Sequence, residues 1–369
     1  MSSSTRSARA LVLEAPRTLV ARDFALPEIG DDDALLRIEA CGLCGTDHEE
    51  YTGQLFPGYA FVPGHESVGI VDRIGPDAAR RWNVQTGDRV AVEVFLSCGV
   101  CAACAGGAYR RCERHGLRDM YGFVPVDRAP GLWGGYAQYQ YLAPDSLLLP
   151  IPGGLDPVTA TIFNPLGAGI RWAVTVPELH AGAVVAVLGP GVRGLSAAAA
   201  AREAGAAFVM VTGLGARDAN RLTLAREFGA DLAVDVDTTD PARALRDATG
   251  GLADVVVDVT AKAPAALGQA VSLARAGGTV VLAGTRGSGD TPGFEPDLVV
   301  YKELRILGAL GVDAAAYRAA LDLLATGKYP FAELPRRVVG LDDVDALIRS
   351  MAGEGDPPPV HGVVVPREG

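Results

Sequence analysis

Four cysteines in the first third of the chain have the spacing of a metal-binding loop. The motif Cys98-x2-Cys101-x2-Cys104-x7-Cys112 supplies enough thiolates to close a tetrahedral site. A closed site leaves no position for a substrate, so zinc bound here would be structural. An iron–sulfur run would place its fourth cysteine where this chain has Ala108, and would follow it with proline. The spacing therefore predicts a structural zinc site.

A second group of metal-binding residue types lies closer to the N-terminus. Cys44 is followed by Asp47, and the sequence Gly64-His65-Glu66 comes about twenty residues later. Cysteine and histidine are ligands of catalytic zinc, which keeps one position open for substrate. On the residues alone, a surface pair of His65 and Glu66 remains an alternative, and neighbouring Cys41 fits a small buried side chain better than a ligand.

A glycine-rich loop predicts a dinucleotide site in the second half of the chain. The sequence Gly189-Pro190-Gly191-Val192-Arg193-Gly194 follows an apolar run and opens a helical stretch. In this context the first glycine permits a tight turn and the second lets a pyrophosphate approach the backbone. The third lets the helix pack closely on the sheet.

The end of the next predicted strand bears on the choice between NAD and NADP. An acidic residue there would bind the ribose 2′-hydroxyl of NAD, but the strand ends at Gly213, and Arg217 and Arg221 follow. Nearby cations without that carboxylate suit a 2′-phosphate, although Asp218 weakens the contrast. The sequence favours NADP over NAD by a small margin.

The composition describes a globular protein and excludes several classes of partner. The 369 residues, 49% of them hydrophobic, correspond to roughly two domains of about 150 residues each. The net charge of −11 would repel a nucleic-acid backbone or an anionic membrane. The N-terminal segment lacks the apolar stretch of a signal peptide, and no other stretch suits a membrane span. We expect a cytoplasmic protein whose thiols stay reduced and available for metal.

The apolar pattern predicts two kinds of domain. Short Val-rich runs in the first third are typical of a small all-β unit. From Ala181 to Arg305, apolar runs alternate with Ala-rich helical stretches, which predicts a parallel sheet covered by helices on both faces. The predicted strands there are 184–188, 208–212, 232–236, 255–259 and 279–283, and the predicted helices are 195–204, 219–228 and 263–275. After Arg305 the alternation stops, and two helical segments (314–325 and 342–352) and a Val-rich run (362–365) follow.

Together these motifs resemble the zinc-dependent medium-chain alcohol dehydrogenases along essentially the whole chain. The match rests on Cys44-Gly-Thr-Asp47, Gly64-His65-Glu66, Gly87-Asp88-Arg89-Val90, the four-cysteine loop, Gly134-Gly135-Tyr136-Ala137 and the loop 189–194. The resemblance implies an α/β fold with a GroES-like, β-rich catalytic domain at residues 1–160 and 308–369. It implies a Rossmann domain, a doubly wound parallel sheet, at residues 161–307. It also implies a homodimer or homotetramer formed through an edge of the cofactor sheet, for which the segment 294–300 is the candidate.

The resemblance assigns roles to individual residues. Cys44 and His65 match ligands of a catalytic zinc, and Glu66 matches an acid that coordinates or supports the metal. Thr46 matches the hydroxyl that binds the substrate oxygen and passes its proton onward, and Asp47 matches a partner that orients His65. A second, structural zinc is implied at Cys98, Cys101, Cys104 and Cys112. The cofactor residues are Gly189, Gly191, Val192, Arg193, Gly194, Gly213, Arg217 and Arg221.

Two positions depart from the family pattern. The third ligand of the catalytic zinc, usually Cys, Glu or Asp, falls where this chain has Asn164, a poor and neutral ligand. Asn164, Glu66 and water all remain open as that ligand. The relay histidine falls where this chain has Glu49, one place after His48, so that either residue, or neither, moves the proton.

The implied reaction is hydride transfer between an alcohol and NAD(P), with zinc as a Lewis acid. Aromatic and apolar residues near the metal motifs favour a bulky, apolar, secondary alcohol, although burial in the core is their usual fate. They are Tyr51, Leu55, Phe56, Tyr59, Phe61, Tyr121, Phe123 and Trp133. Two rival functions remain open. One is a zinc-independent enone or quinone reductase, and the other is a non-catalytic nucleotide sensor, which Asn164 favours.

Overall fold

Two β-sheets organise the chain, one in each of two units. The computed structural model describes residues 6–287 and 289–366, so the first residues of the segment in which no signal peptide is expected lie outside it. The first unit comprises residues 1–163, 321–326 and 331–369, and the second comprises residues 164–320 and 327–330. The resemblance implies boundaries at residues 160 and 307 for the same kind of split domain.

The first unit is built on an antiparallel sheet with the strand order β14-β15-β3-β4-β5-β7, in which β6 also pairs with β3. The pair β14–β15 is parallel, and the other neighbours are antiparallel. The strands are β3 (Ala34–Leu43), β4 (Glu66–Ile74), β5 (Arg89–Val92), β6 (Tyr139–Leu142), β7 (Leu148–Pro150), β14 (Arg336–Val339) and β15 (His361–Val364). A hairpin of β1 (Ser7–Ala15) and β2 (Thr18–Ala25) and the helices α1 (Gly45–Tyr51), α2 (Pro76–Trp82), α3 (Ala102–Ala105), α4 (Pro157–Ala160) and α12 (Val344–Met351) complete it.

Strand β3 leads to the metal-binding residues and serves both apolar cores of this unit. Its alternate residues Ala34, Leu36 and Ile38 lie in one core, as the two-residue period of a strand requires. Cys41 and Leu43 lie an odd number of residues further along the strand, so the same period turns them toward the other core.

The second unit contains a six-stranded parallel sheet in the order β10-β9-β8-β11-β12-β13. Its strands are β8 (Val184–Leu188), β9 (Phe208–Gly213), β10 (Leu232–Asp235), β11 (Ala253–Asp258), β12 (Ala274–Leu282) and β13 (Arg305–Gly308). The helices α5 (Phe163–Ile170), α6 (Val192–Glu203), α7 (Gly215–Ala225), α8 (Pro241–Thr249), α9 (Ala266–Leu273), α10 (Pro296–Tyr301) and α11 (Ala314–Ala325) belong wholly or mostly to this unit.

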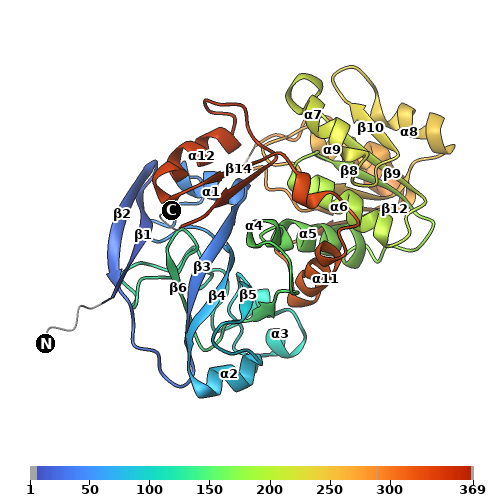
Figure 1. The fold of residues 1–369 in the computed structure, drawn as a ribbon. Helices are drawn as coiled ribbons and strands as arrows, with labels where there is room; N and C mark the ends of the chain where they lie inside the picture. The colour runs from blue at the N-terminus through green and yellow to red at the C-terminus, as the bar shows by residue number, and fades with distance from the viewer. Residues whose placement is uncertain (1–5, 288, 367–369) are drawn as a thin grey trace, which may run out of the picture. The chain divides into compact units, whose positions relative to one another are not determined.

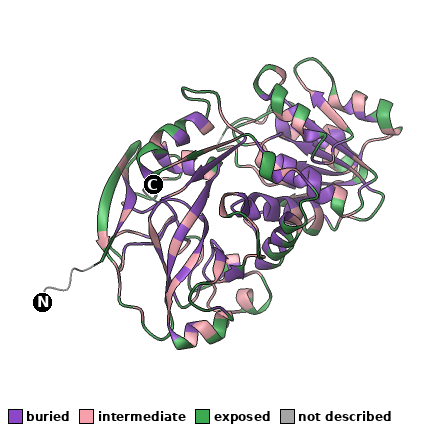
Figure 2. Cartoon of the chain, in the orientation of Figure 1, coloured by how far each residue is buried: buried purple, intermediate pink, exposed green. Residues whose placement is uncertain are grey.

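This sheet is doubly wound, which confirms the predicted Rossmann architecture. The chain starts at β8 in the middle, adds β9 and β10 on one side, and then returns to add strands beyond β11 on the other. Figure 1 shows helices packed around the sheet, and the near-continuous burial of β8 and β9 appears as purple strands in Figure 2. A reversal of strand order creates a crevice at the carboxyl ends of the central strands, where ligands bind in such folds.

Two elements differ from the sequence-based expectations. The alternation does not stop at Arg305, because Arg305–Gly308 forms β13 at the edge of the sheet. The segment 294–300, expected at that edge, lies mostly in α10 (Pro296–Tyr301). Its valines are typical of a strand, but proline in the first turn has the φ of a helix and lacks only an N–H that is unpaired there. Across the described ranges, none of the helices is long and apolar enough to cross a membrane.

Candidate active site and metal centres

Cys44 lies where β3 ends and α1 begins, and its position is fixed by Asp47. The Cys44 backbone N–H donates to Asp47 Oδ2 at 2.8 Å, and the Tyr136 hydroxyl donates to Asp47 Oδ1 at 2.8 Å. The first of these bonds makes Asp47 the N3 partner in a capping box on Cys44. Asp47 thus fixes the Cys44 backbone, and the role that the resemblance implies for it, orienting His65, stays a prediction.

The structure brings Cys44, His65 and Glu66 together. One ligand atom from each lies within 4.8 Å of the other two, and all three residues are buried. Cys44 Sγ and His65 Nε2 are 3.2 Å apart, close to the separation of about 3.6 Å that Zn–S and Zn–N bonds of ~2.3 and ~2.05 Å give at a tetrahedral angle. Buried side chains of this chemistry fit a divalent cation bound between them.

Local backbone and charge support this arrangement. Gly42 pairs with Glu66 across β3 and β4, and a Cβ atom on Gly42 would lie 2.3 Å from Glu66 Oε2, so the glycine leaves room for the carboxylate. Burial opposes the charge on His65, but the negative charges of Cys44 and Asp47 hold its pKa well above the ordinary value. Negative charge near His65 thus favours a cation bound between Cys44, His65 and Glu66.

Cys41 is a small buried side chain. Its Sγ atom lies 3.9 Å from the Ser67 hydroxyl, and a Cβ atom on Gly135 would come within 2.4 Å of it. Burial raises the pKa of the Cys41 thiol well above its usual value, and Cys41 stands outside the close set of Cys44, His65 and Glu66, which fits a core thiol better than a thiolate ligand.

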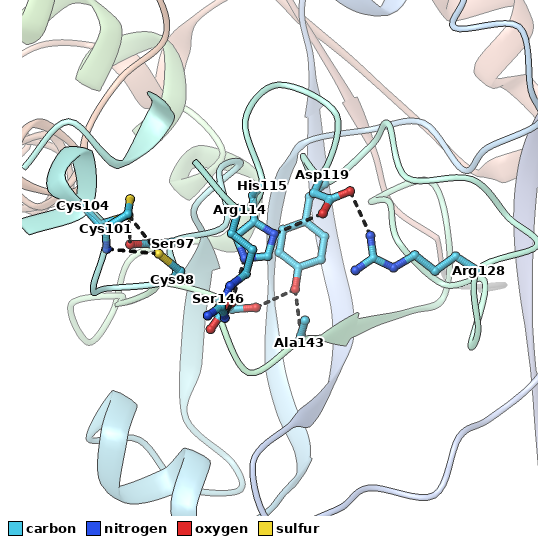
Figure 3. Close-up of polar contacts among 12 residues, drawn as sticks. Ser97, Cys98, Cys101, Cys104, Arg114, His115, Asp119, Arg128, Ala143 and Ser146 are labelled. Carbon is cyan, nitrogen blue, oxygen red and sulfur yellow. Dashed lines mark hydrogen bonds and ion pairs between the residues drawn. The ribbon is translucent and has the colours of Figure 1, made fainter. Parts of the chain in front are cut away.

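The four remaining cysteines form a second cluster, part of which is drawn in Figure 3. The sulfur atoms of Cys98, Cys101, Cys104 and Cys112 all lie within 4.8 Å of one another. Those of Cys98 and Cys104 are 3.8 Å apart, which equals the edge of about 3.8 Å expected for a tetrahedron with Zn–S bonds of ~2.3 Å. Burial opposes ionisation of Cys112, but backbone N–H groups, including that of Cys98, lower its pKa to about 6. This donor set fits zinc.

A polar network fixes the segment that follows this cysteine loop (Figure 3). His115 lies between two carboxylates, with Nδ1 3.1 Å from Asp119 Oδ2 and Nε2 2.7 Å from Asp145 Oδ2. Arg128 donates to Asp119 at 2.9 Å, and Arg114 donates to Asp145 at 3.1 Å. The network ties the chain after Cys112 to the distant segment near residue 145, and sequence reasoning did not find it.

The glycine-rich loop borders a pocket of about 320 Å³ in the second unit. Gly189 has a φ of +102°, which favours glycine, and a Cβ atom on Gly194 would lie 1.7 Å from the Gly189 carbonyl oxygen. Around Gly191 there is nothing within 4 Å of such an atom, so its backbone is open to a ligand. Seven of the eight expected cofactor residues line this pocket, and Val192 is not among its lining residues. The seven are Gly189, Gly191, Arg193, Gly194, Gly213, Arg217 and Arg221. Thr260 and Gln269, which the sequence did not suggest, line it as well.

Two arginines and one aspartate stand at the pocket wall beyond β9. Asp218 Oδ2 accepts the Leu214 N–H at 3.1 Å, and Asp218 Oδ1 accepts from Arg221 at 3.2 Å. Asp218 is buried, whereas Arg217 is exposed. The negative charge of Asp218 is therefore balanced by Arg221 within α7. Arg217 remains as the exposed positive charge at this pocket.

Asn164 is engaged by residues of its own unit. Its amide Nδ2 donates to the Tyr317 hydroxyl at 2.9 Å, and its Oδ1 accepts from the Arg193 guanidinium at 3.4 Å. The same guanidinium lies over the Trp172 ring, 5.4 Å from its centroid. The oxygen that would have to bind zinc thus faces a fixed positive charge.

The two relay candidates have different surroundings. His48 Nε2 lies 3.1 Å from Glu354 Oε1, and Arg17 binds both oxygens of Glu354 at 3.0 and 3.1 Å. Hydrogen bonds from Arg17 and then from His48 lower the pKa of Glu354 to about 2. His48 therefore lies against a carboxylate, and Thr46, His48 and Glu49 are all half-buried on the same helix.

Some of the aromatic candidates form a chain of rings that reaches the metal-binding residues. The centroids of Phe56 and Phe61, of Phe61 and Phe123, and of Phe123 and His65 are 6.2, 6.1 and 6.1 Å apart. Tyr121 and Trp133 are instead core residues, with exposed fractions of 1% and 3%. Phe56 and Phe123 are only half-buried. Phe123 is the ring of this chain that lies next to His65.

Two residues near Cys44 were missed by sequence reasoning. Tyr136 belongs to a motif used for the resemblance, but nothing in the sequence indicated its bond to Asp47. Glu50 is completely buried one helical turn after Asp47. The three-residue spacing of Cys44, Asp47 and Glu50 was the available signal, because residues three apart share a helix face.

Comparisons with known proteins agree with this architecture. A family model described as the alcohol dehydrogenase GroES-like domain matches residues 30–153, and one described as zinc-binding dehydrogenase matches residues 193–326. A "Probable alcohol dehydrogenase" of Mycobacterium tuberculosis is 71% identical over 360 residues, which cover 97% of this chain and 98% of that protein. Sorbitol dehydrogenase of Bacillus subtilis is 30% identical over 323 residues, 86% of each chain. The structure of a zinc-binding dehydrogenase of Sinorhizobium meliloti bound to NADP is 32% identical, with a TM-score of 0.82 over 98% of this chain and 100% of that one.

Proposed function

The chain belongs to the zinc-dependent medium-chain alcohol dehydrogenases, oxidoreductases that act on alcohols, and we propose that it oxidises a bulky, apolar, secondary alcohol or reduces the matching ketone. The observation that carries this proposal is the buried set of Cys44, His65 and Glu66, with ligand atoms within 4.8 Å of one another. The preference for an apolar substrate rests on Phe123, whose ring centroid lies 6.1 Å from that of His65, and on Phe56 further along the same chain of rings.

We propose that Cys44, His65 and Glu66 are the protein ligands of the catalytic zinc and that Asn164 is not a ligand. A neutral amide oxygen is a weak zinc ligand, and this oxygen already accepts a bond from Arg193. A second zinc ion would be held by the four cysteines of the loop 98–112, whose tetrahedral spacing leaves no open position.

Residues of the first unit then have separate roles in the reaction. When bound, zinc supplies the Lewis acidity that lowers the pKa of an alcohol, and the nicotinamide supplies the acceptor for its hydride. Asp47 fixes the Cys44 backbone through its N–H. The Thr46 hydroxyl accepts the alcohol proton, and His48, held by Glu354, is the preferred next carrier toward solvent.

We propose NADP as the preferred cofactor because Arg217 is the outward cation at the pocket beyond β9, while the carboxylate of Asp218 is neutralised by Arg221. An Arg217→Ala variant is expected to lose about tenfold or more in kcat/KM with NADP⁺ and to change little with NAD⁺, because one charge-assisted bond to a phosphate contributes roughly 1.5–3 kcal/mol. An equal loss with both cofactors would contradict the NADP assignment.

We also propose a homo-oligomer that forms through the edge strand β13 and the exposed residues Val300 and Tyr301 of α10. An unpaired sheet edge beside exposed apolar side chains is a natural pairing surface for a second copy. A cytoplasmic location is proposed because all six cysteines are free, as metal-binding thiols must be.

The test of the proposed function is a panel of alcohols assayed in parallel with NAD⁺ and NADP⁺. We expect cyclohexanol-like and benzylic secondary alcohols to give a higher kcat/KM than sorbitol or other polyols. Replacement of Phe123 by Ala should reduce that preference. A polyol as the best substrate would overturn the proposed substrate class, and reduction of enones or quinones after zinc removal would favour a zinc-independent reductase.

A further inference from the structure

Three potentially anionic side chains lie along one face of α1, and the proposed metal mechanism uses only two of them. Cys44, Asp47 and Glu50 are spaced by three residues, the spacing that places side chains on one helix face. Cys44 is in the proposed ligand set, and Asp47 accepts bonds from Cys44 and Tyr136. Glu50 has no role so far.

Glu50 is an unusual residue energetically. Its exposed fraction is 0%, and neither carboxylate oxygen has a hydrogen-bond partner among the described residues. A buried carboxylate without donors is strongly unfavourable, so such groups are normally paired with a cation or coordinate a metal. The buried Glu93 of the same unit illustrates the usual solution, because its oxygens accept from the Tyr109 hydroxyl and the Phe95 N–H.

The charges that act most strongly on Glu50 belong to the metal-binding residues. After burial itself, the largest influences on its pKa are the charges of Asp47, His65 and Cys44, and the overall direction is upward. His65 presents a matching irregularity, since its buried Nδ1 has no hydrogen-bond partner within the described part of the chain. Glu50 and His65 are therefore two buried groups without hydrogen-bond partners among the described residues that interact electrostatically with each other.

We propose that Glu50 is an outer carboxylate of the catalytic metal centre, a positioning residue that raises the affinity of the site for zinc. Glu50 stands outside the close set of Cys44, His65 and Glu66, so it acts through its charge and through hydrogen bonds to groups on the metal. It supplies, from within the first unit, a negative charge that neutral Asn164 does not provide. This inference rests on the proposed catalytic zinc site.

The zinc affinity of the purified full chain tests the proposal without using enzymatic activity. Glu50→Gln keeps the size of the side chain and removes its charge, and Glu93→Gln is the matched control for loss of a buried carboxylate elsewhere in the same unit. Zinc dissociation from the Cys44 site is measured by competition with a chromophoric chelator, and the site is also followed by the d–d absorption of Co²⁺ in its place. Outer partners of metal ligands typically contribute about 10–100-fold in affinity.

We expect Glu50→Gln to raise the zinc Kd of the Cys44 site at least about tenfold, with the four-cysteine site unchanged. Glu50→Asp should fall closer to the wild type than Glu50→Gln, because it keeps the charge. Glu93→Gln should leave the affinity of the Cys44 site unchanged. Each variant is first shown to have a wild-type circular dichroism spectrum.

Two results would overturn the proposal, and they are distinguishable. If the wild type binds a second zinc and Glu50→Gln binds it with unchanged affinity, Glu50 is merely a neutral acid in the core and the proposed function survives. If the wild type binds zinc only at the four cysteines, the catalytic site and the role of Glu50 both fail.

Discussion

The sequence shows that Asn164 is a poor zinc ligand, but it does not predict which residues bind its amide. The amide is recognisable as a poor zinc ligand, whereas its partner Tyr317 lies 153 residues away and no local pattern predicts that contact. The same limit applies to His361, which appears in the sequence as an ordinary histidine of a Val-rich run. In the fold it is completely buried in β15, and neither ring nitrogen has a hydrogen-bond partner among the described residues.

His361 should make stability depend on pH. Burial, followed by the charge of Arg336, lowers the pKa of His361 from 6.5 to about 3. The folded state therefore keeps the ring neutral while the unfolded state binds a proton below pH 6.5, so stability is lost as the pH falls from 6.5 toward 3. Between pH 7 and pH 5 this residue should cost about 2 kcal/mol of unfolding free energy.

Urea unfolding of the wild type and of His361→Asn at pH 7, 6 and 5 measures this contribution. The variant should lose about 2 kcal/mol less than the wild type over that range, because it has no proton to bind. Identical losses for the two proteins would show that His361 is not held neutral.

Among the elements, the connection from β8 into α6 contains two glycines with different roles. We expect Gly194 to be needed for the fold and Gly191 to be needed for cofactor binding. A methyl group on Gly194 would meet the Gly189 carbonyl oxygen at 1.7 Å, whereas one on Gly191 would have nothing within 4 Å. Gly194→Ala should destabilise the fold by roughly 1–3 kcal/mol. Gly191→Ala should change stability by less than about 0.5 kcal/mol but weaken NADP binding about tenfold or more, because its methyl group occupies the approach of the pyrophosphate.

Thermal unfolding of the free protein and fluorescence titration with NADPH check this pair of variants. Wild-type affinity in Gly191→Ala would mean that the pyrophosphate does not bind at this loop.

Helices and strands were predictable from the sequence where their apolar pattern was strong and their residues are buried. The runs that became β8, β9 and β11 are almost entirely buried, so their composition reflects their place in the sheet. Strand β13 was missed because it has only four residues, none of them fully buried, at the sheet edge. Helix α10 was expected at the sheet edge because Val299 and Val300 are typical of strands, and the proline that begins the helix is a weaker signal. The four-cysteine loop was predictable because its ligand spacing is local in sequence, whereas Glu50 required the three-dimensional neighbours of α1.

For the whole molecule, the homo-oligomer that we propose would form through β13 and α10. Val300 and Tyr301 have exposed fractions of 71% and 77%, which is high for apolar side chains beside an unpaired sheet edge. Light scattering coupled to size exclusion should give a dimer or tetramer for the wild type. Val300→Glu combined with Tyr301→Glu should shift it to a smaller species, because charge in an apolar interface is unfavourable. A monomeric wild type, or an unchanged mass in the variant, would contradict this interface.

Metal content and alcohol oxidation, measured on the same samples, test whether the chain holds a catalytic zinc at Cys44 and a structural zinc at the four cysteines. The wild type should contain about two zinc ions per chain, Cys44→Ser about one with dehydrogenase activity abolished, and Cys41→Ser about two with activity retained. Two zinc ions in Cys44→Ser, or equal loss of activity in both variants, would show that Cys44 is not a ligand of a catalytic zinc.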